Sequence, residues 1–329
     1  MRSRASEPSA SRGQLATVVI PTYNHGQWVS GAIESVLAQD YEPIEIIVVD
    51  DGSSDGTRQV VERFGEAVRY VWQENRGLSA ARNTGIQLAA GEYIGVLDAD
   101  DFYESNFMSV LVSRLNARPD AEAIYCGYRF VDAQNRPLPQ VESRDVAPAA
   151  LFQTLAEGNF LVPEAILVRR RCYAAVGPFD ESLRAIEDMD MWLRISRDHT
   201  VIGCSEILTR HRVLPVSMST DPERQCVNRL KVITKLFGAV PDDPATMPEA
   251  SRRAHARARL TATVEHLQCS REARARELFV EMVRICPTLL LELDTFYGTE
   301  PGTVCRPDKI FSRHCRPLAK KQQYRRKAK

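Results

Sequence analysis

The sequence predicts an α/β protein with a mixed, mostly parallel sheet, helices on both faces and a small C-terminal helical appendage. Three observations carry this prediction. β-branched apolar segments alternate with helix-like segments in the first hundred residues, polar turn residues follow each apolar segment, and the last third is helix-like with few β-branched runs. The chain has 329 residues, of which 44% are hydrophobic, and this is enough for a sizeable core.

The first hundred residues are expected to form four buried strands joined by three helices. The expected strands are 16–20, which Pro21 ends, 44–49, 68–72 and 93–97, and the expected helices are 29–37, a segment after Gly56 and 78–89. Such alternation is typical of a parallel sheet, whose ligands bind beyond the carboxyl ends of the strands. The strand ends to inspect are therefore 21–24, 50–56 and 98–101.

We expect four parts along the chain. They are a disordered leader at 1–14, the α/β domain at 15–220, the helical appendage at 221–299 and a basic, disordered tail at 300–329. Further strands are expected at 123–126 and 165–168 and a helix at 187–197, and the appendage helices are expected at 223–238, 250–268 and 270–285.

The charge distribution does not suit a general nucleic-acid binder. The 43 basic and 43 acidic residues cancel, but Arg306–Lys329 holds ten Lys and Arg residues and one acid, so the rest of the chain is acidic. An acidic body lacks the basic face that nucleic acids require, and no nucleic-acid partner is expected. The tail is expected either to contact anionic lipid peripherally or to act as a solubilising end.

The termini and cysteines suggest the compartment. Residues 1–14 hold no apolar core of a secretory signal, and no run of about 18 apolar residues is present to span a membrane. The eight cysteines form no C-x-x-C pair, so we expect reduced thiols. A cytoplasmic protein, with peripheral contact at the inner face of the membrane, is the expectation.

Three carboxylates follow the fourth expected strand. Asp98, Asp100 and Asp101 repel one another unless a cation or a polar loop compensates them. Oxygen ligands at positions i and i+2 suit a hard divalent cation such as Mg²⁺ or Mn²⁺, which often bridges substrate phosphates. The alternative is a solvated acidic turn that caps a helix starting near Glu104.

Polar residues also follow the first two strands. Asp50 and Asp51 end the second strand, where a carboxylate can accept hydrogen bonds from a base or ribose. The Ser and Asp residues after them also suit a helix cap, with Ser54 or Asp55 as the N-cap. Tyr23, after the first strand, could stack on a base or simply cover the core.

Two further segments offer charged groups. Arg82, in the small-residue helix that starts after Gly77, could hold a pyrophosphate or take part in a structural ion pair. Glu187, Asp188 and Asp190 begin a helix, where acids either favour the helix dipole or supply a general base. The six histidines have no metal-binding spacing, and we interpret each as surface or core filler.

Taken in order, these segments resemble the family-2 inverting glycosyltransferases of the GT-A fold, a Rossmann-like fold of nucleotide-diphospho-sugar transferases. The resemblance covers roughly 15–220 and rests on five ordered motifs. They lie within the stretches TVVIPTYNHGQWVSGAIESVLAQDYEPIEIIVVDDGSSDGT, ENRGLSAARNTGIQLAAGEYIGVLDADD and GPFDESLRAIEDMDMWLRI.

The resemblance implies roles for individual residues. It places Pro21, Tyr23 and Asp51 at the nucleoside base. It makes Asp98 and Asp100 the D-x-D pair that holds the ribose or diphosphate and Mn²⁺ or Mg²⁺. Together with the residue-level analysis, Arg82 and Arg212 become candidate donor-binding residues, and Asp188 corresponds to the catalytic base that deprotonates the acceptor hydroxyl.

One departure concerns the loop after the base helix. The family often has Tyr-Arg-x-His-x-x-Ser-x-Ser there, in a lid over the diphosphate. The chain has His211-Arg212 and then Leu214 where the family has His. The lid's hold on phosphate is therefore expected to differ, whereas the metal and base positions keep their residues.

The expected function is metal-dependent, inverting transfer of a sugar from a UDP-, GDP- or dTDP-sugar. The acceptor hydroxyl would belong to a glycan, a lipid-linked molecule or a protein, in cell-surface polysaccharide, glycolipid or glycoprotein glycan synthesis. A catalytically degenerate sugar-nucleotide binding module is the alternative, which Leu214 alone favours. A nucleotidyltransferase would need a Gly-rich basic loop after the first strand, and 21–26 offers none. An interaction role of the helical appendage is compatible with the enzyme.

Overall fold

The computed structural model describes residues 13–214 and 221–292. These residues form two compact units. The first contains 13–149, 161–181 and 194–214, and the second contains 150–160, 182–193 and 221–292.

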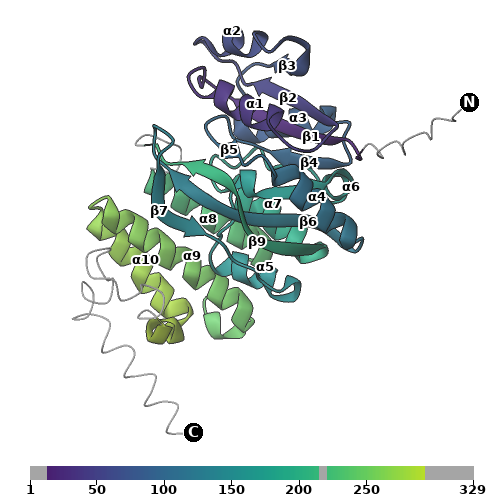
Figure 1. Cartoon of the computed structure of the whole chain (residues 1–329). Helices are drawn as coiled ribbons and strands as arrows, with labels where there is room; N and C mark the ends of the chain where they lie inside the picture. Colours follow the sequence, from purple (N-terminus) through teal and green to yellow (C-terminus); the bar gives the residue numbers. More distant parts are fainter. Residues whose placement is uncertain (1–12, 215–220, 293–329) are drawn as a thin grey trace, which may run out of the picture. The chain divides into compact units, whose positions relative to one another are not determined.

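The first unit is built on a nine-stranded mixed sheet (Figure 1). Its order is β3-β2-β1-β4-β8-β6-β9-β5, and β7 pairs with β6 beside this path. The strands are β1 (Ala16–Thr22), β2 (Ile44–Asp50), β3 (Arg69–Trp72), β4 (Tyr93–Val96), β5 (Phe102–Tyr103), β6 (Ala121–Val131), β7 (Pro137–Glu142), β8 (Ile166–Arg169) and β9 (Thr200–Arg212). Strands β1 to β4 are parallel, β8 runs antiparallel to β4 and β6, and β9 runs parallel to β6. The predicted mixed sheet is confirmed.

The first strand is longer than predicted. The sequence suggested that Pro21 ends it, but β1 continues through Pro21 to Thr22 against β2. Pro21 is tolerated because β4 pairs with β1 from Ala16 to Val19, so no ladder hydrogen bond to β4 is expected of Pro21. The extension carries the loop that holds Tyr23 further out from the sheet edge.

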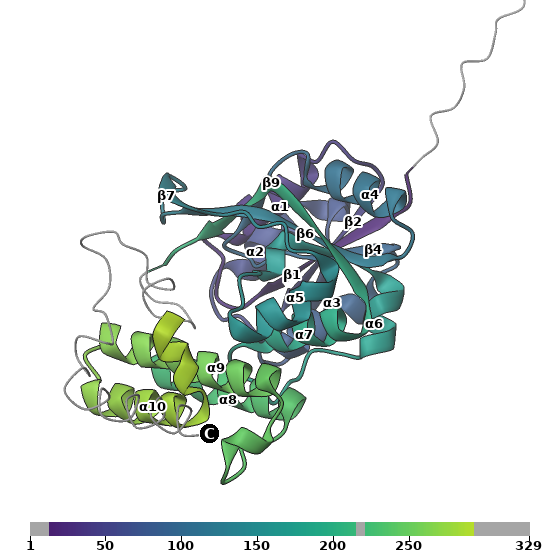
Figure 2. The ribbon, with the colours of Figure 1, turned by 90° about the horizontal axis from the view of Figure 1, so that it is seen from below.

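Helices cover both faces of strands β1 to β4, as predicted (Figure 2). Val18 and Ile20 of β1 pack in one buried cluster with Ile33 of α1 and Phe107 of α4. On the opposite face α3 approaches so closely that its Gly85 abuts Val19. The helices of this unit are α1 (Val29–Leu37), α2 (Thr57–Glu62), α3 (Leu78–Leu88), α4 (Phe107–Ala117) and α6 (Arg170–Val176).

Several elements of the middle section were not predicted. They are β5, β7, β9, α5, α6 and the full length of β6, whereas the helix expected to start near Glu104 corresponds to α4, which begins at Phe107. Strand β6 spans 11 residues and β9 spans 13, and both mix buried and exposed positions around register shifts. Such irregular strands lack a clean alternation, so periodicity reveals little of them.

The second unit is helical. Helices α8 (Pro222–Phe237), α9 (Glu249–Gln268) and α10 (Glu272–Ile285) confirm the three predicted appendage helices and pack side by side (Figure 1). Leu260 of α9 and Phe279 of α10 lie in its buried cluster. The unit also contains most of α5 (Pro148–Glu157) and the first seven residues of α7 (Glu187–Asp198). Residues 1–12, 215–220 and 293–329, including the predicted basic tail, lie outside the described part.

Two expectations about the whole chain can be followed in the described residues. Their cysteines are all free thiols: Cys126, Cys172, Cys204, Cys226, Cys269 and Cys286. Among these same residues, none of the helices has both the length and the apolar character required to cross a membrane.

We predict that Gly85→Ala destabilises the protein by about 1–3 kcal/mol, the usual effect of overpacking. A Cβ at Gly85 would lie 2.2 Å from Val19 Cγ1, so α3 would have to move away from the sheet. The midpoint of urea unfolding measures this. Gly158→Ala is the control because a Cβ there meets nothing within 4 Å. Equal midpoints for the two variants would contradict the packing argument.

Candidate functional site

The carboxyl end of β4 carries a charged turn whose first acid is held by a buried arginine. Arg82 Nη2, from α3, lies 2.8 and 3.1 Å from the two carboxylate oxygens of Asp98. The Arg82 side chain is 1% exposed and the Asp98 side chain 24% exposed. The Arg82 guanidinium also lies over the Phe179 ring, 5.4 Å from its centroid. Asp98 is therefore fixed in orientation while remaining open to solvent.

The next two acids of the turn are electrostatically strained. Burial and the charges of Asp101 and Asp98 raise the pKa of Asp100 to about 6, although His25 opposes the shift. Burial and the charge of Glu164 raise the pKa of Asp101 to about 7. Among the described side chains, none donates a hydrogen bond to the Asp100 carboxylate. A partly exposed carboxylate that lacks a cationic partner is the type of group that binds a divalent cation.

Arg212, at the end of β9, holds the backbone of this turn by hydrogen bonds. Its Nε donates to the Asp100 carbonyl oxygen at 2.8 Å, and its Nη1 donates to the Asp132 and Ala133 carbonyl oxygens. Its guanidinium lies between two aromatic rings, 4.4 Å from the Trp28 centroid and 4.8 Å from the Phe102 centroid. Arg212 therefore holds the backbone that carries Asp100.

Three further side chains meet beside the turn. Asp101 Oδ2 lies 3.2 Å and Glu164 Oε1 lies 2.8 Å from His211 Nδ1. Asp101 Oδ1 also accepts the Arg212 backbone N–H at 2.6 Å. Burial lowers the pKa of His211, but the two carboxylates outweigh this and raise it well above the ordinary value. The interpretation of every histidine as filler is therefore wrong for His211.

The residues predicted to contact the base occupy the ends of β1 and β2. The Tyr23 ring is 49% exposed and Pro21 is buried. The Asp51 carboxylate accepts hydrogen bonds from Gln73 Nε2 at 2.6 Å, Arg76 N at 3.0 Å and Gly77 N at 2.7 Å. Since a carboxylate has about four acceptor positions, Asp51 shapes the 73–77 loop and retains capacity for one more donor.

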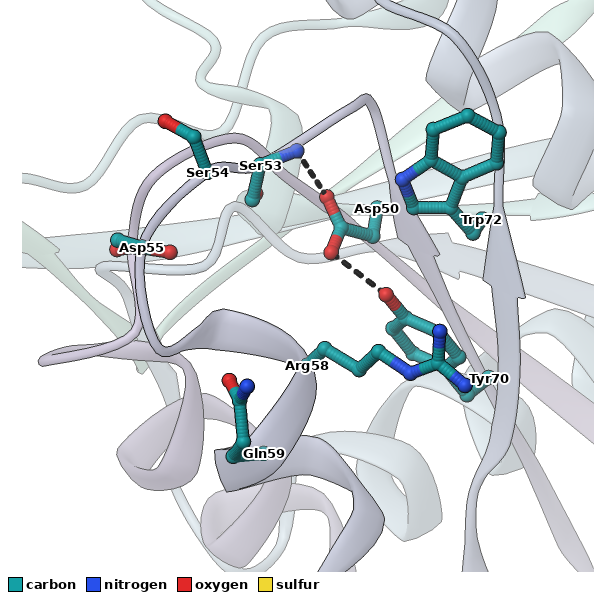
Figure 3. Close-up of a pocket in the computed structure, with 8 residues that line it drawn as sticks. All are labelled: Asp50, Ser53, Ser54, Asp55, Arg58, Gln59, Tyr70 and Trp72. Carbon is teal, nitrogen blue, oxygen red and sulfur yellow. Dashed lines mark hydrogen bonds between the residues drawn. The ribbon is translucent and has the colours of Figure 1, made fainter.

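A pocket of about 430 Å³ lies between the 50–55 segment after β2, the start of α2 and β3 (Figure 3). The buried Asp50 carboxylate accepts the Ser53 N–H at 2.8 Å and the Tyr70 hydroxyl at 2.7 Å. Arg58 lies along the Tyr70 ring, and Trp72, which is 55% exposed, stands at the rim. The other lining residues are Ser54, Asp55 and Gln59. The N-cap residue of α2 is Gly56, so the prediction of Ser54 or Asp55 as the N-cap is wrong; Asp55 lies one residue earlier, and its Oδ1 accepts the Thr57 N–H at 2.9 Å.

The predicted base lies in the first turn of α7, in the second unit. Glu187 and Asp190 are buried, and Asp190 Oδ1 lies 2.9 Å from Lys235 Nζ of α8. Asp188 is partly exposed, so it is the most accessible of these three acids. Ile186, just before the helix, has φ of 64°, a conformation that is strained for a β-branched residue.

The structure therefore groups Asp98, Asp100, Arg82 and Arg212 around one turn, and Pro21, Tyr23 and Asp51 at neighbouring strand ends. The structure describes Leu214, but the predicted lid residues at 215–219 lie outside the described part. Glu164 and His211 were missed because they come from η2 (Pro163–Ala165) and β9, far from the acidic turn in sequence. No spacing rule detects such a set.

A family model for glycosyl transferase family 2 matches residues 17–177. Residues 17–177 form a family 2 glycosyltransferase domain. The match spans the strand ends and the acidic turn described above, so the resemblance expected from the motifs is confirmed. The described fold is that of a GT-A protein.

Individual proteins agree with this family 2 domain. An uncharacterized glycosyltransferase of Rickettsia typhi is 35% identical over 208 residues, which is 60% of this chain and 64% of that protein. The chain thus spans just under two thirds of that relative's length. An Escherichia coli UDP-Glc:alpha-D-GlcNAc-diphosphoundecaprenol beta-1,3-glucosyltransferase is 27% identical over 67% of this chain and 85% of its own length.

A solved structure shares the fold. It is a mannosyltransferase from Pyrobaculum calidifontis in complex with GDP-Man and Mn²⁺, with a TM-score of 0.57 and 21% identity. The match covers 87% of this chain and 76% of that one.

We predict that Asp98→Asn destabilises the protein by about 3 kcal/mol, because it leaves the buried Arg82 charge without its carboxylate partner. Chemical denaturation measures the free energy of unfolding. Asp120→Asn is the matched control: Asp120 pairs with Arg118, and both side chains are more than half exposed. We expect the control to change stability by less than about 1 kcal/mol. Equal effects would contradict the role of burial.

We predict that Asp100→Asn stabilises the cation-free protein, and that the gain grows with pH. The folded-state pKa of Asp100 is about 6, above that of the unfolded chain, so folding opposes its ionisation. The wild-type protein loses this stability as pH rises from about 4 to 6, and the loss then stays constant. Urea unfolding in EDTA at pH 4.5, 6 and 7.5 measures the difference. A gain that is independent of pH would contradict the assignment.

Proposed function

We propose that this protein is an inverting glycosyltransferase that moves a sugar from a nucleoside diphosphate sugar to an acceptor hydroxyl, with Mn²⁺ or Mg²⁺. One observation supports the proposal most: Asp98 and Asp100 lie in one turn after β4 in the family 2 domain, Arg82 holds Asp98, and no described side chain donates a hydrogen bond to the Asp100 carboxylate. This arrangement matches a site for a cation and a diphosphate.

The neighbouring strand ends suit the nucleoside. The exposed Tyr23 ring offers a stacking surface, and the spare acceptor capacity of Asp51 suits an N–H of a base. Pro21 extends β1 so that Tyr23 stands beyond the sheet edge. The similarity to a UDP-glucose-dependent enzyme and to a GDP-Man complex supports a UDP- or GDP-sugar as donor, and a dTDP-sugar stays a prediction.

We propose that Arg82 and Arg212 affect donor binding indirectly, because they hold the turn that carries Asp98 and Asp100. Arg82 holds the Asp98 carboxylate, and Arg212 holds the Asp100 backbone. Both guanidiniums are buried, so we propose that they position the acidic residues. Direct contact of either arginine with pyrophosphate stays a prediction.

The residues fit a divalent cation. Asp100, with Asp98 beside it, would hold the ion, since its carboxylate lacks a hydrogen-bond donor among the described side chains and its pKa is raised by burial and by like charges. When bound, Mn²⁺ or Mg²⁺ would offset the charge that develops on the leaving diphosphate.

Asp188 is the proposed general base. It would accept the proton of the acceptor hydroxyl, whose oxygen then forms a bond to the anomeric carbon as the bond to the diphosphate oxygen breaks. Attack from the face opposite the leaving group inverts the anomeric configuration. The partial exposure of Asp188 supports this assignment over its buried neighbours Glu187 and Asp190.

The acceptor class is proposed from the relatives. The Escherichia coli relative acts on a diphosphoundecaprenol-linked sugar, which supports a lipid-linked or glycan acceptor in cell-surface polysaccharide synthesis. Peripheral membrane contact through 306–329 stays a prediction because those residues lie outside the described part.

Donor turnover tests the function. We expect the full-length protein to release nucleoside diphosphate from one member of a UDP-, GDP- and dTDP-sugar panel with MnCl₂ or MgCl₂, with water or added saccharides as acceptors. We expect EDTA to abolish the release. Selective donor binding without release under any condition would favour the catalytically degenerate module, for which Leu214 is the supporting observation.

We predict that Asp188→Asn lowers turnover by roughly 100- to 10,000-fold and leaves donor affinity within a few-fold, because the base acts on the acceptor. Initial rates and donor titration by calorimetry measure the two effects. Asp198→Asn, at the other end of α7 and paired with the exposed Arg197, is the control and should retain full activity. Wild-type turnover in Asp188→Asn would remove Asp188 from the mechanism.

A further inference from the structure

Asp101, Glu164 and His211 form a cluster that the proposed transfer reaction does not use. Asp101 follows β4, Glu164 lies in η2, and His211 lies in β9. One ligand atom from each lies within 4.8 Å of the others. Three separate segments thus present two carboxylates and one imidazole to the same point.

The cluster carries more negative charge than its own residues compensate. The Asp101 and Glu164 side chains are 2% and 0% exposed, and both face the same ring nitrogen of His211. That nitrogen can donate one proton, so it satisfies one carboxylate at a time. Two buried carboxylates beside one imidazole therefore carry more negative charge than a single imidazolium offsets, and either a bound proton or a cation would offset the remainder.

Buried oxygens in and near the cluster that lack a hydrogen-bond partner among the described residues support the same point. Glu164 Oε2 is fully buried and has no hydrogen-bond partner among the residues that the structure describes, although the other oxygen of its carboxylate faces His211. Thr209 and Tyr103 pair across β9 and β5, and Thr209 lies two residues before His211. Within the described part of the chain, Thr209 Oγ1 and the Tyr103 hydroxyl are also buried without a hydrogen-bond partner. A bound cation would give this buried carboxylate oxygen a partner, as would a buried water.

We propose that Asp101, Glu164 and His211 bind a second divalent cation, separate from the ion proposed at Asp98 and Asp100. Two carboxylates and a neutral imidazole balance a 2+ charge. The separations of 2.8 and 3.2 Å from Nδ1 match the ligand-to-ligand edge of an octahedral shell with bonds of about 2.1 Å, which is about 3.0 Å. A mixed nitrogen and oxygen set favours Mn²⁺, Co²⁺ or Zn²⁺ over Mg²⁺.

The site would be structural in effect. It ties β9 and η2 to the turn that carries Asp98 and Asp100, and Asp101 Oδ1 links it to the backbone N–H of Arg212. His211 is 31% exposed, so part of its side chain lies at the protein surface.

Mn²⁺ binding to the full-length, EDTA-dialysed protein, without nucleotide, tests the proposal by electron paramagnetic resonance. We expect one Mn²⁺ whose electron spin-echo modulation shows a directly bound imidazole nitrogen. Glu164→Gln, which keeps the side-chain size and removes a buried charge, should weaken this binding by roughly 10- to 100-fold or more. His211→Gln should abolish the nitrogen coupling.

Two variants separate this site from the proposed donor site. The charge of His25 acts on Asp100, so a His25 nitrogen is the nearest alternative source of the coupling at the proposed donor site. His25→Gln is the control that removes this alternative. We expect His25→Gln and Asp100→Asn to retain the nitrogen-coupled ion whether or not the protein proves to be a transferase. Loss of that ion in Asp100→Asn, its persistence in folded His211→Gln or unchanged affinity in folded Glu164→Gln would overturn the proposal, as would absence of nitrogen coupling in the wild type.

Discussion

Mutual repulsion among the carboxylates at the end of β4 is the constraint on which the site depends. Asp98, Asp100 and Asp101 occupy one turn, and the charge of Glu164 acts on Asp101 as well. Each of the three acids in the turn has a different set of neighbours. Arg82 neutralises Asp98, Arg212 and His211 hold Asp101, and Asp100 keeps a raised pKa. A bound cation would therefore stabilise this turn.

The sheet topology makes this compensation possible. Strand β9 pairs with β5 directly after the acidic turn, and this register brings His211 and Arg212 back to residues more than a hundred positions earlier. Helix α3 packs closely against β1 because Gly85 has no side chain, and the same helix carries Arg82. Close packing of α3 thus brings Arg82 to the turn, and long-range strand pairing brings Arg212 to the same turn.

Burial also sorts residues of the same type into different roles. Asp50 and Asp51 are adjacent and both buried, yet Asp50 binds Tyr70 beside the pocket, whereas Asp51 holds the 73–77 loop. In α7, Asp190 lies beside Lys235, whereas Asp188 keeps partial exposure. Adjacent residues in a strand or helix point in different directions, so their chemistry follows from the neighbours that packing assigns to them.

The sequence by itself determined the α/β class, the first four strands, the appendage helices and the choice of Asp98 and Asp100 as candidate site residues, because these depend on periodicity and on motifs within one segment. The tertiary structure alone decided that Arg82 and Arg212 are buried supports of the turn, and that Glu164 and His211 join Asp101. The physical reason is that periodicity reports whether a position is buried, whereas the partner that a buried charge meets depends on strand order and register. Strands β6 and β9 are irregular, with register shifts along their pairing, and no local pattern encodes where such strands bring their side chains.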